Sequence, residues 1–255
     1  MLVFLIGLFY TKLSLKLVII GTIAAFIGTL AGGGGLITIP AMMLVGIPIQ
    51  TSIATNKFSS GIAALSSIFY LLYHKELRLA SIMKYVAVAI AGGICGALLT
   101  VSISEKTMNV IACILLIFAL FVTLKNKEWT VTSEENYTKH DNKLWQPFLI
   151  AVYDGGFGPG SSTFSILHYL RYHYSYIKAV QLTRVLIFGS CTGAFSVFYQ
   201  TGFIQWQYAI AMAVGSIIGS QIGLLVLPKI PIKVAKILLT IIISLLLIQV
   251  TIKII

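Results

Sequence analysis

Long runs of apolar residues follow one another along almost the whole chain, separated by short polar segments. A helix that crosses the hydrocarbon core of a bilayer needs about 20 apolar residues. Several runs approach or exceed that length, and the pattern therefore predicts an all-α, polytopic transmembrane bundle. The runs cover residues 49–73, 79–103, 107–124, 174–200, 203–227 and 232–255.

Glycines interrupt two further apolar segments. Gly32, Gly33, Gly34 and Gly35 stand consecutively within residues 17–45, and a second glycine-rich break covers residues 155–160. Inside a bilayer, unwound backbone is tolerated only where protein buries it or where it lines a cavity. Paired breaks in corresponding halves of a chain therefore indicate a substrate site.

One offset relates the two halves. Moving the chain by 127 residues places Gly28 on Gly155, Gly33 on Gly160 and the basic Lys57 on Arg184. We expect two four-segment repeats, at residues 1–124 and 144–255, each opening with a glycine-broken helix. The polar stretch at residues 125–143 separates them as a linker.

Loop charge bears on the direction of the repeats. If each broken segment crosses once, the basic residues divide almost evenly between the two faces. If each dips in and returns, most loop lysines and arginines share one face, and only Lys12, Lys16, Lys106 and Lys253 lie opposite. Cytoplasmic loops carry the basic excess, so charge favours inverted repeats with re-entrant hairpins and both termini outside.

Composition limits the class of protein. The chain is 58% hydrophobic and 10% charged, with a mean hydropathy of +0.97. Its net charge of +11 lies mainly in short loops, which favours a multi-pass protein of the cytoplasmic membrane over nucleic-acid binding. Histidines and cysteines lack metal-ligand spacing, and we expect neither a metal nor another cofactor.

Spaced glycines indicate close helix packing. Gly92 and Gly96 form one such pair, and Gly215, Gly219 and Gly223 continue the spacing in the second half. Small residues at this spacing let helices approach closely. Packing inside the bundle and contacts in a homo-oligomer are the two interpretations.

The glycine breaks favour an anion. Each leaves a half-helix whose first amides have no intrahelical acceptor, and that end carries about half a positive charge. Gly158 and Gly160 precede the second half-helix, and Ser161 and Ser162 follow. Their hydroxyls either cap that helix or contact a ligand.

Two basic residues lie well inside apolar spans. Lys57 and Arg184 either extend to the interface or turn inward and supply positive potential to an anion. Asn56 and Thr183 precede them and can donate hydrogen bonds to a polar ligand. Asp154, immediately before the second break, either pairs with one of the bases, caps the turn, or couples transport to a proton or cation.

Enzyme signatures are missing from the sequence. An intramembrane aspartyl protease needs a second aspartate in a span, and Ser161 and Ser162 lack the context of a serine protease. Neither glycine run has the phosphate-loop pattern that binds ATP. We therefore expect transport of the secondary type and no catalysis.

The motifs resemble those of the sulfite exporter TauE/SafE family of membrane permeases. The resemblance rests on the cluster from Gly32 to Pro40, the run from Ala54 to Lys57, and the run from Tyr153 to Gly160. It implies movement of sulfur-containing anions such as sulfite and sulfonates, often coupled to protons. Here Ser161 and Ser162 stand where Thr-Gly is frequent, and Arg184 where Lys is frequent.

We therefore predict a secondary transporter, a permease or exporter, of small anions. The alternatives are a cation- or proton-coupled transporter of another solute and a membrane scaffold that transports nothing. The predicted substrate-binding residues lie at both breaks and on the spans after them, with Asp154 in a coupling or structural role. They are Gly32, Gly33, Gly34, Gly35, Asn56, Lys57, Gly158, Gly160, Ser161, Ser162, Thr183 and Arg184.

Overall fold

The computed structural model describes residues 12–104 and 144–229, with scattered residues between 106 and 121 and at 234, 237 and 241. These residues confirm the all-α prediction, since their regular structure is helical. The predicted linker and the predicted spans at 107–124 and 232–255 lie wholly or largely outside them.

Eight described helices follow in two sets of four. The first set is α2 (Lys12–Ala31), α3 (Gly34–Leu44), α4 (Ile49–Tyr73) and α5 (Leu79–Val101); the second is α7 (Trp145–Gly156), α8 (Ser161–Arg171), α9 (Tyr176–Gln200) and α10 (Trp206–Val226). Four of them, α2, α5, α9 and α10, are long and apolar enough to cross a membrane. α4 has 25 residues, but Asn56 and Lys57 interrupt its apolar surface.

Each glycine break joins two helices that fold back on each other. In the first pair, Met42 near the end of α3 packs in one cluster with Leu17 near the start of α2. In the second, Tyr172 just after α8 donates a 3.0 Å hydrogen bond to Gln146 at the start of α7. Both pairs are therefore helical hairpins with the glycine break at the tip.

The two hairpins begin at opposite ends of the bundle. Glu76, just after α4, is bonded to Lys178 at the start of α9, while Phe58 of α4 packs on Phe195 late in α9. The helices α4 and α9 therefore run antiparallel, and each directly follows its hairpin. The re-entrant arrangement expected from loop charge has this geometry, although the origin of the halves by duplication stays a prediction.

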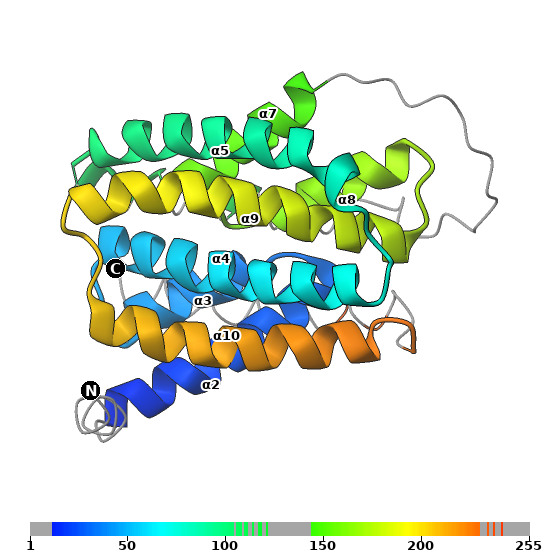
Figure 1. Ribbon diagram of the computed structural model, residues 1–255. Helices are drawn as coiled ribbons and strands as arrows, with labels where there is room; N and C mark the ends of the chain where they lie inside the picture. Colours follow the sequence, from blue (N-terminus) through cyan, green and yellow to red (C-terminus); the bar gives the residue numbers. More distant parts are fainter. Residues whose placement is uncertain are drawn as a thin grey trace.

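The described helices other than α3 and α8 form a row. Each neighbouring pair makes contact in the order α7, α5, α9, α4, α10, α2, and Figure 1 shows α7 and α2 at the two edges with α9 and α4 between them. Exchanging each helix for its counterpart in the other half, α2 for α7, α4 for α9 and α5 for α10, gives the same order read from the opposite edge. A pseudo-two-fold relation thus passes between α4 and α9, beside the hairpin tips.

The 127-residue offset also relates helix boundaries. It carries α3 (34–44) onto α8 (161–171) and α4 (49–73) onto α9 (176–200) at both ends, and the start of α5 at 79 onto the start of α10 at 206. Three pairs of residues with positive φ are also separated by this offset. They are Gly33 with Gly160, Gly46 with His173, and Lys75 with Gly202. The shared register supports an internal repeat.

The breaks are shorter than the glycine runs suggest. Gly34 and Gly35 are the first two residues of α3, so the first break consists of Gly32 and Gly33. In the second half α7 continues through Gly156, which leaves residues 157–160 as the break. Glycine has no side chain whose periodicity could locate a helix end. The sequence therefore predicted breaks that were longer than the observed ones.

The spaced glycines pack inside the chain. A Cβ on Gly92 would meet Phe148 and Val152 of α7, and a Cβ on Gly219 would meet Thr22 and Phe26 of α2. Both contacts bring helix backbones together, as the first of the two interpretations predicts.

Candidate functional site

The two hairpin tips meet in the middle of the bundle. A Cβ on Gly32 would lie 2.6 Å from the backbone nitrogen of Thr163, and one on Gly35 would lie 3.3 Å from the Cα of Pro159. Glycine at these positions lets the start of α3 and the second break lie against each other. The first amides of α3 and α8 therefore lie close to one centre.

Polar side chains satisfy several backbone carbonyls that the breaks leave free. Thr100 donates to the Gly156 carbonyl at 2.7 Å, and Tyr153 donates to the Pro159 carbonyl at 2.6 Å. In the first half the Gly28 carbonyl accepts from the Gly32 amide at 3.1 Å and also from Arg184 at 2.7 Å. An unpaired carbonyl would cost several kcal/mol in hydrocarbon, so these bonds stabilise the unwound tips.

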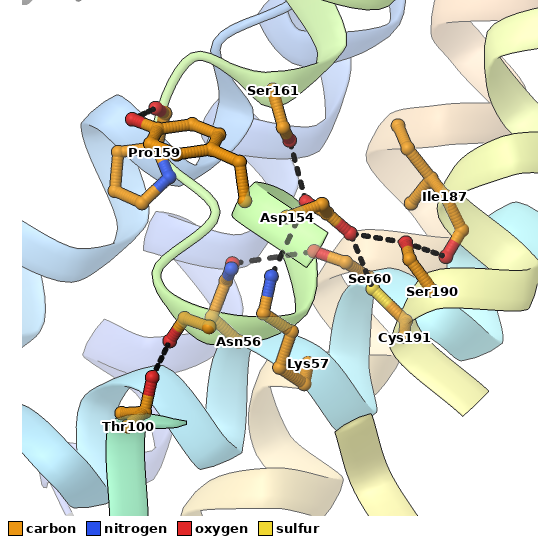
Figure 2. A network of polar contacts seen from close by, with 12 residues as sticks. Asn56, Lys57, Ser60, Thr100, Asp154, Pro159, Ser161, Ile187, Ser190 and Cys191 are labelled. Carbon is orange, nitrogen blue, oxygen red and sulfur yellow. Dashed lines mark hydrogen bonds and ion pairs between the residues drawn. The ribbon is translucent and has the colours of Figure 1, made fainter. Parts of the chain in front are cut away.

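Asp154 is the centre of the polar network in Figure 2. Its carboxylate forms an ion pair with Lys57 at 3.2 Å, and the side chains of both residues are buried. Ser161 donates to the same carboxylate at 2.5 Å, and Ser190 donates to its other oxygen. Cys191 lies 3.7 Å from that second oxygen. Of the roles considered for Asp154, pairing with Lys57 is the one that this structure contains.

Arg184 is buried and pairs with no carboxylate of the described residues. The residue is 6% exposed, and its guanidinium donates from Nη2 to Gly28. Its Nε has no hydrogen-bond partner among the described residues. A buried charge costs several kcal/mol unless it is paired, and a partly satisfied guanidinium can still donate hydrogen bonds to an oxyanion.

A small cavity lies between the tips. Its volume is about 40 Å³, enough for a very small number of waters or a small ion. Its charged lining residues are Asp154 and Arg184. Polar atoms come mainly from the second hairpin and α4, while small residues of α2 and α3 provide space. The lining residues are Ala24, Ala25, Gly28, Gly34, Gly35, Thr38, Asn56, Ser60, Ala63, Asp154, Gly158, Ser161, Ser162, Arg184, Ile187, Cys191 and Ser216.

Most of the predicted site residues line this cavity. Those that do are Gly34, Gly35, Asn56, Asp154, Gly158, Ser161, Ser162 and Arg184. The other predicted residues do not line the cavity. Gly33 and Gly160 are the N-caps of α3 and α8, and Gly32 contacts Thr163. Thr183 donates to the Ala179 carbonyl of its own helix at 2.8 Å. Lys57 turns to Asp154.

Sequence reasoning missed several lining residues that helical spacing links to the predicted ones. Ser60 lies one turn after Asn56 and donates to its side-chain oxygen at 3.2 Å. Cys191 lies two turns after Arg184 on α9 and lines the same cavity. Positions four and seven apart share a helix face, so extending the stripe from Asn56 and Arg184 would have found both.

The two ends of the bundle differ. At the end where α4 stops and α9 starts, a cavity of about 430 Å³ is lined by residues that include Glu76, Lys178 and Gln181. Gln181 is 5% exposed and precedes Arg184 by about one turn of α9. Near the other end, Phe58, Phe195 and Trp206 pack ring against ring.

Paired hairpins that meet between antiparallel spans define a polytopic membrane protein with a central polar site, and comparison with known proteins places it more closely. The family profile described as "Sulfite exporter TauE/SafE" matches residues 17–250. The chain therefore belongs to the TauE/SafE family, a family of membrane transporters, and is a multi-pass protein of the cell membrane.

Curated relatives are similar over most of their length. A "Probable membrane transporter protein ORF9" of Sinorhizobium is 36% identical over 79% of this chain and 78% of the relative. A "Probable membrane transporter protein" of Haemophilus influenzae is 31% identical over 80% and 81%. The protein YfcA of Escherichia coli is 29% identical over 80% and 77%. No solved structure matches the chain.

Proposed function

We propose that this transporter moves a small oxyanion, with sulfite and sulfonates as the leading candidates, and binds it between the hairpin tips. The observation that carries the proposal is Arg184, a buried guanidinium that lines a cavity and has an Nε without a partner among the described residues. Transport is of the secondary type, because the sequence contains no pattern for ATP binding.

Backbone geometry adds to the positive potential of Arg184. The Leu36 amide in α3 donates to the Gly33 carbonyl and the Ser161 amide in α8 to the Gly158 carbonyl, but both helix ends still carry partial positive charge. Gly35, Ser161 and Ser162 line the cavity at these ends. An anion there would receive charge-assisted hydrogen bonds from the guanidinium and dipole stabilisation from two half-helices.

Asn56 and the serine hydroxyls are the orienting groups in this proposal. Asn56 accepts from Ser60 through its side-chain oxygen, which leaves its amide nitrogen as a donor toward a ligand. That nitrogen would lie 3.5 Å from a Cβ on Gly35, so it lies beside the start of α3. We do not assign Thr183 a direct contact with the anion, because its hydroxyl donates to a carbonyl within α9.

Access in this proposal follows the difference between the two ends. The larger cavity at the α9 start forms a vestibule, while the rings of Phe58, Phe195 and Trp206 close the other side. Loop lysines and arginines such as Lys75, Lys178 and Lys229 belong to the vestibule end, which we assign to the cytoplasm. Rocking of one half against the other would exchange the open side.

The cation-coupled alternative would place a cation at Asp154. Lys57 and the donors Ser161 and Ser190 already surround that carboxylate. A second cation would first have to displace the ammonium group of Lys57. The geometry therefore favours an anion as the transported solute, and a proton or cation as a coupling partner is a separate question.

Flux into proteoliposomes tests the proposal. The purified chain should take up labelled sulfite or methanesulfonate, and Arg184→Gln should lower uptake by at least about tenfold, since one charge-assisted hydrogen bond is worth about 1.5–3 kcal/mol. Lys84→Gln, at an exposed position of α5, is the matched control and should retain wild-type uptake. Undiminished uptake by a folded Arg184→Gln variant would rule out the site.

A further inference from the structure

The contacts of Lys57 and Arg184 correspond across the 127-residue register. Lys57, on α4, extends to Asp154 near the end of α7. Arg184, on α9, extends to Gly28 near the end of α2. Each buried base thus crosses to the first helix of the opposite hairpin. The surroundings of the two bases can therefore be compared position by position.

A carboxylate pairs with Lys57, whereas no carboxylate of the described residues pairs with Arg184, which lines the central cavity together with Asp154. The counterpart of Asp154 is Ile27. Besides Lys57, the side chains next to the Asp154 carboxylate are Ser161, Ser190 and Cys191. Their counterparts are Gly34, Ala63 and Ala64, which have no polar side-chain atom. Gly34 and Ala63 line the central cavity together with Arg184.

We propose that Asp154 is a built-in anion at Lys57 and that the cavity beside Arg184 is the matching place for the anion of the substrate. The site then takes one singly charged oxyanion group, such as a sulfonate, a carboxylate or hydrogen sulfite. This inference rests on the proposed function and adds the charge of the substrate to it.

Charge balance gives the physical reason. Lys57 and Asp154 neutralise each other, and Arg184 is the remaining full charge at the cavity. A monoanion at Arg184 completes the balance. A dianion such as sulfate would leave one negative charge unmatched in a buried site, where an unpaired charge costs several kcal/mol. The partial charges of the helix ends offset only part of that cost.

Binding of two tetrahedral oxyanions of different charge tests the inference. Isothermal titration of the detergent-purified full chain would compare methanesulfonate, a monoanion, with sulfate, a dianion. We expect wild type to prefer methanesulfonate. Asp154→Asn keeps the shape of the side chain but frees the charge of Lys57, so the ratio of sulfate affinity to methanesulfonate affinity should rise by at least about tenfold.

Glu76→Gln is the matched control. It removes one negative charge as well, but Glu76 is exposed and bonded to Gln181 at the end of the bundle. Its affinity ratio should remain that of wild type. A rise in both variants would mean that overall charge, and not the built-in anion, sets selectivity, and it would overturn the inference.

A double variant covers the case in which Asp154→Asn alone does not fold. Lys57→Met with Asp154→Asn removes both charges, so no unpaired charge remains. It should bind methanesulfonate with the wild-type preference over sulfate. Loss of methanesulfonate binding in the folded double variant, or an unchanged ratio in Asp154→Asn, contradicts the inference while anion transport stands. If wild type binds neither anion, the proposed function itself fails.

Discussion

The two hairpins share a backbone plan and differ in chemistry. Each has a left-handed glycine, Gly33 or Gly160, directly before a half-helix of 11 residues. The second hairpin carries Asp154, Ser161 and Ser162 at its tip, whereas the first carries glycines and apolar residues. One tip carries polar side chains, and the other carries mainly glycines. A two-fold scaffold can thus build an asymmetric site.

The largest expected contrast concerns the two buried bases. Lys57→Met leaves Asp154 without its counter-charge, and removing one partner of a buried pair costs about 3–5 kcal/mol. Arg184→Met removes a charge that pairs with no carboxylate within residues 12–104 and 144–229, so it should cost much less or stabilise the protein. Denaturant unfolding in detergent micelles would measure both variants.

Equal losses in the two variants would contradict this contrast. They would mean that the Gly28 carbonyl compensates Arg184 as fully as Asp154 compensates Lys57. Lys84→Met, at an exposed position, serves as a control for the loss of one positive charge and should stay within about 0.5 kcal/mol of wild type.

A smaller contrast concerns the counterpart glycines Gly96 and Gly223. A Cβ on Gly96 would meet backbone atoms of Val152 and Gly156, whereas one on Gly223 would meet mainly the side chain of Thr29. Overpacking costs about 1–3 kcal/mol, and backbone yields less readily than a side chain. Gly96→Ala should therefore lower the unfolding midpoint more than Gly223→Ala. The reverse order would show that α5 can shift away from α7.

The smallest contrast concerns positions 75 and 202, which follow α4 and α9. Both have positive φ, 58° at Lys75 and 76° at Gly202. A left-handed conformation costs a non-glycine residue about 1–2 kcal/mol. Lys75→Gly should stabilise and Gly202→Ala should destabilise, each by about 1 kcal/mol. Apart from its chain neighbours, no heavy atom of the described residues lies within 4 Å of a Cβ on Gly202, so conformation would explain its change in thermal midpoint.

Sequence patterns predicted the helices well where apolar runs have polar ends. The predicted span at 49–73 coincides with α4, because Pro48 precedes it and His74 and Lys75 follow it. The glycine runs were less informative, and Gly34 and Gly35 proved helical. The offset found from a few glycines proved to relate whole helices, since it depends on chain length between elements and not on side-chain identity.

Many of the residues that line the central cavity could be singled out from the sequence, but their pairings could not. Lys57, Asp154 and Arg184 stood out as charges in apolar segments, but nothing in the sequence determines which base meets an acid 97 residues away in the chain. Cys191 and Ala63 gave no signal, because cysteine and alanine are ordinary core residues. Their part in the site follows only from the meeting of the tips.

The crossed contacts of the two bases have a consequence for biogenesis. Lys57 finds its carboxylate on α7, and Arg184 finds its carbonyl on α2, so each half contains a base that the other half must complete. Lys57 is synthesised 97 residues before Asp154. Until the second half inserts, Lys57 stays unmatched, and stable integration of either half depends on the arrival of the other.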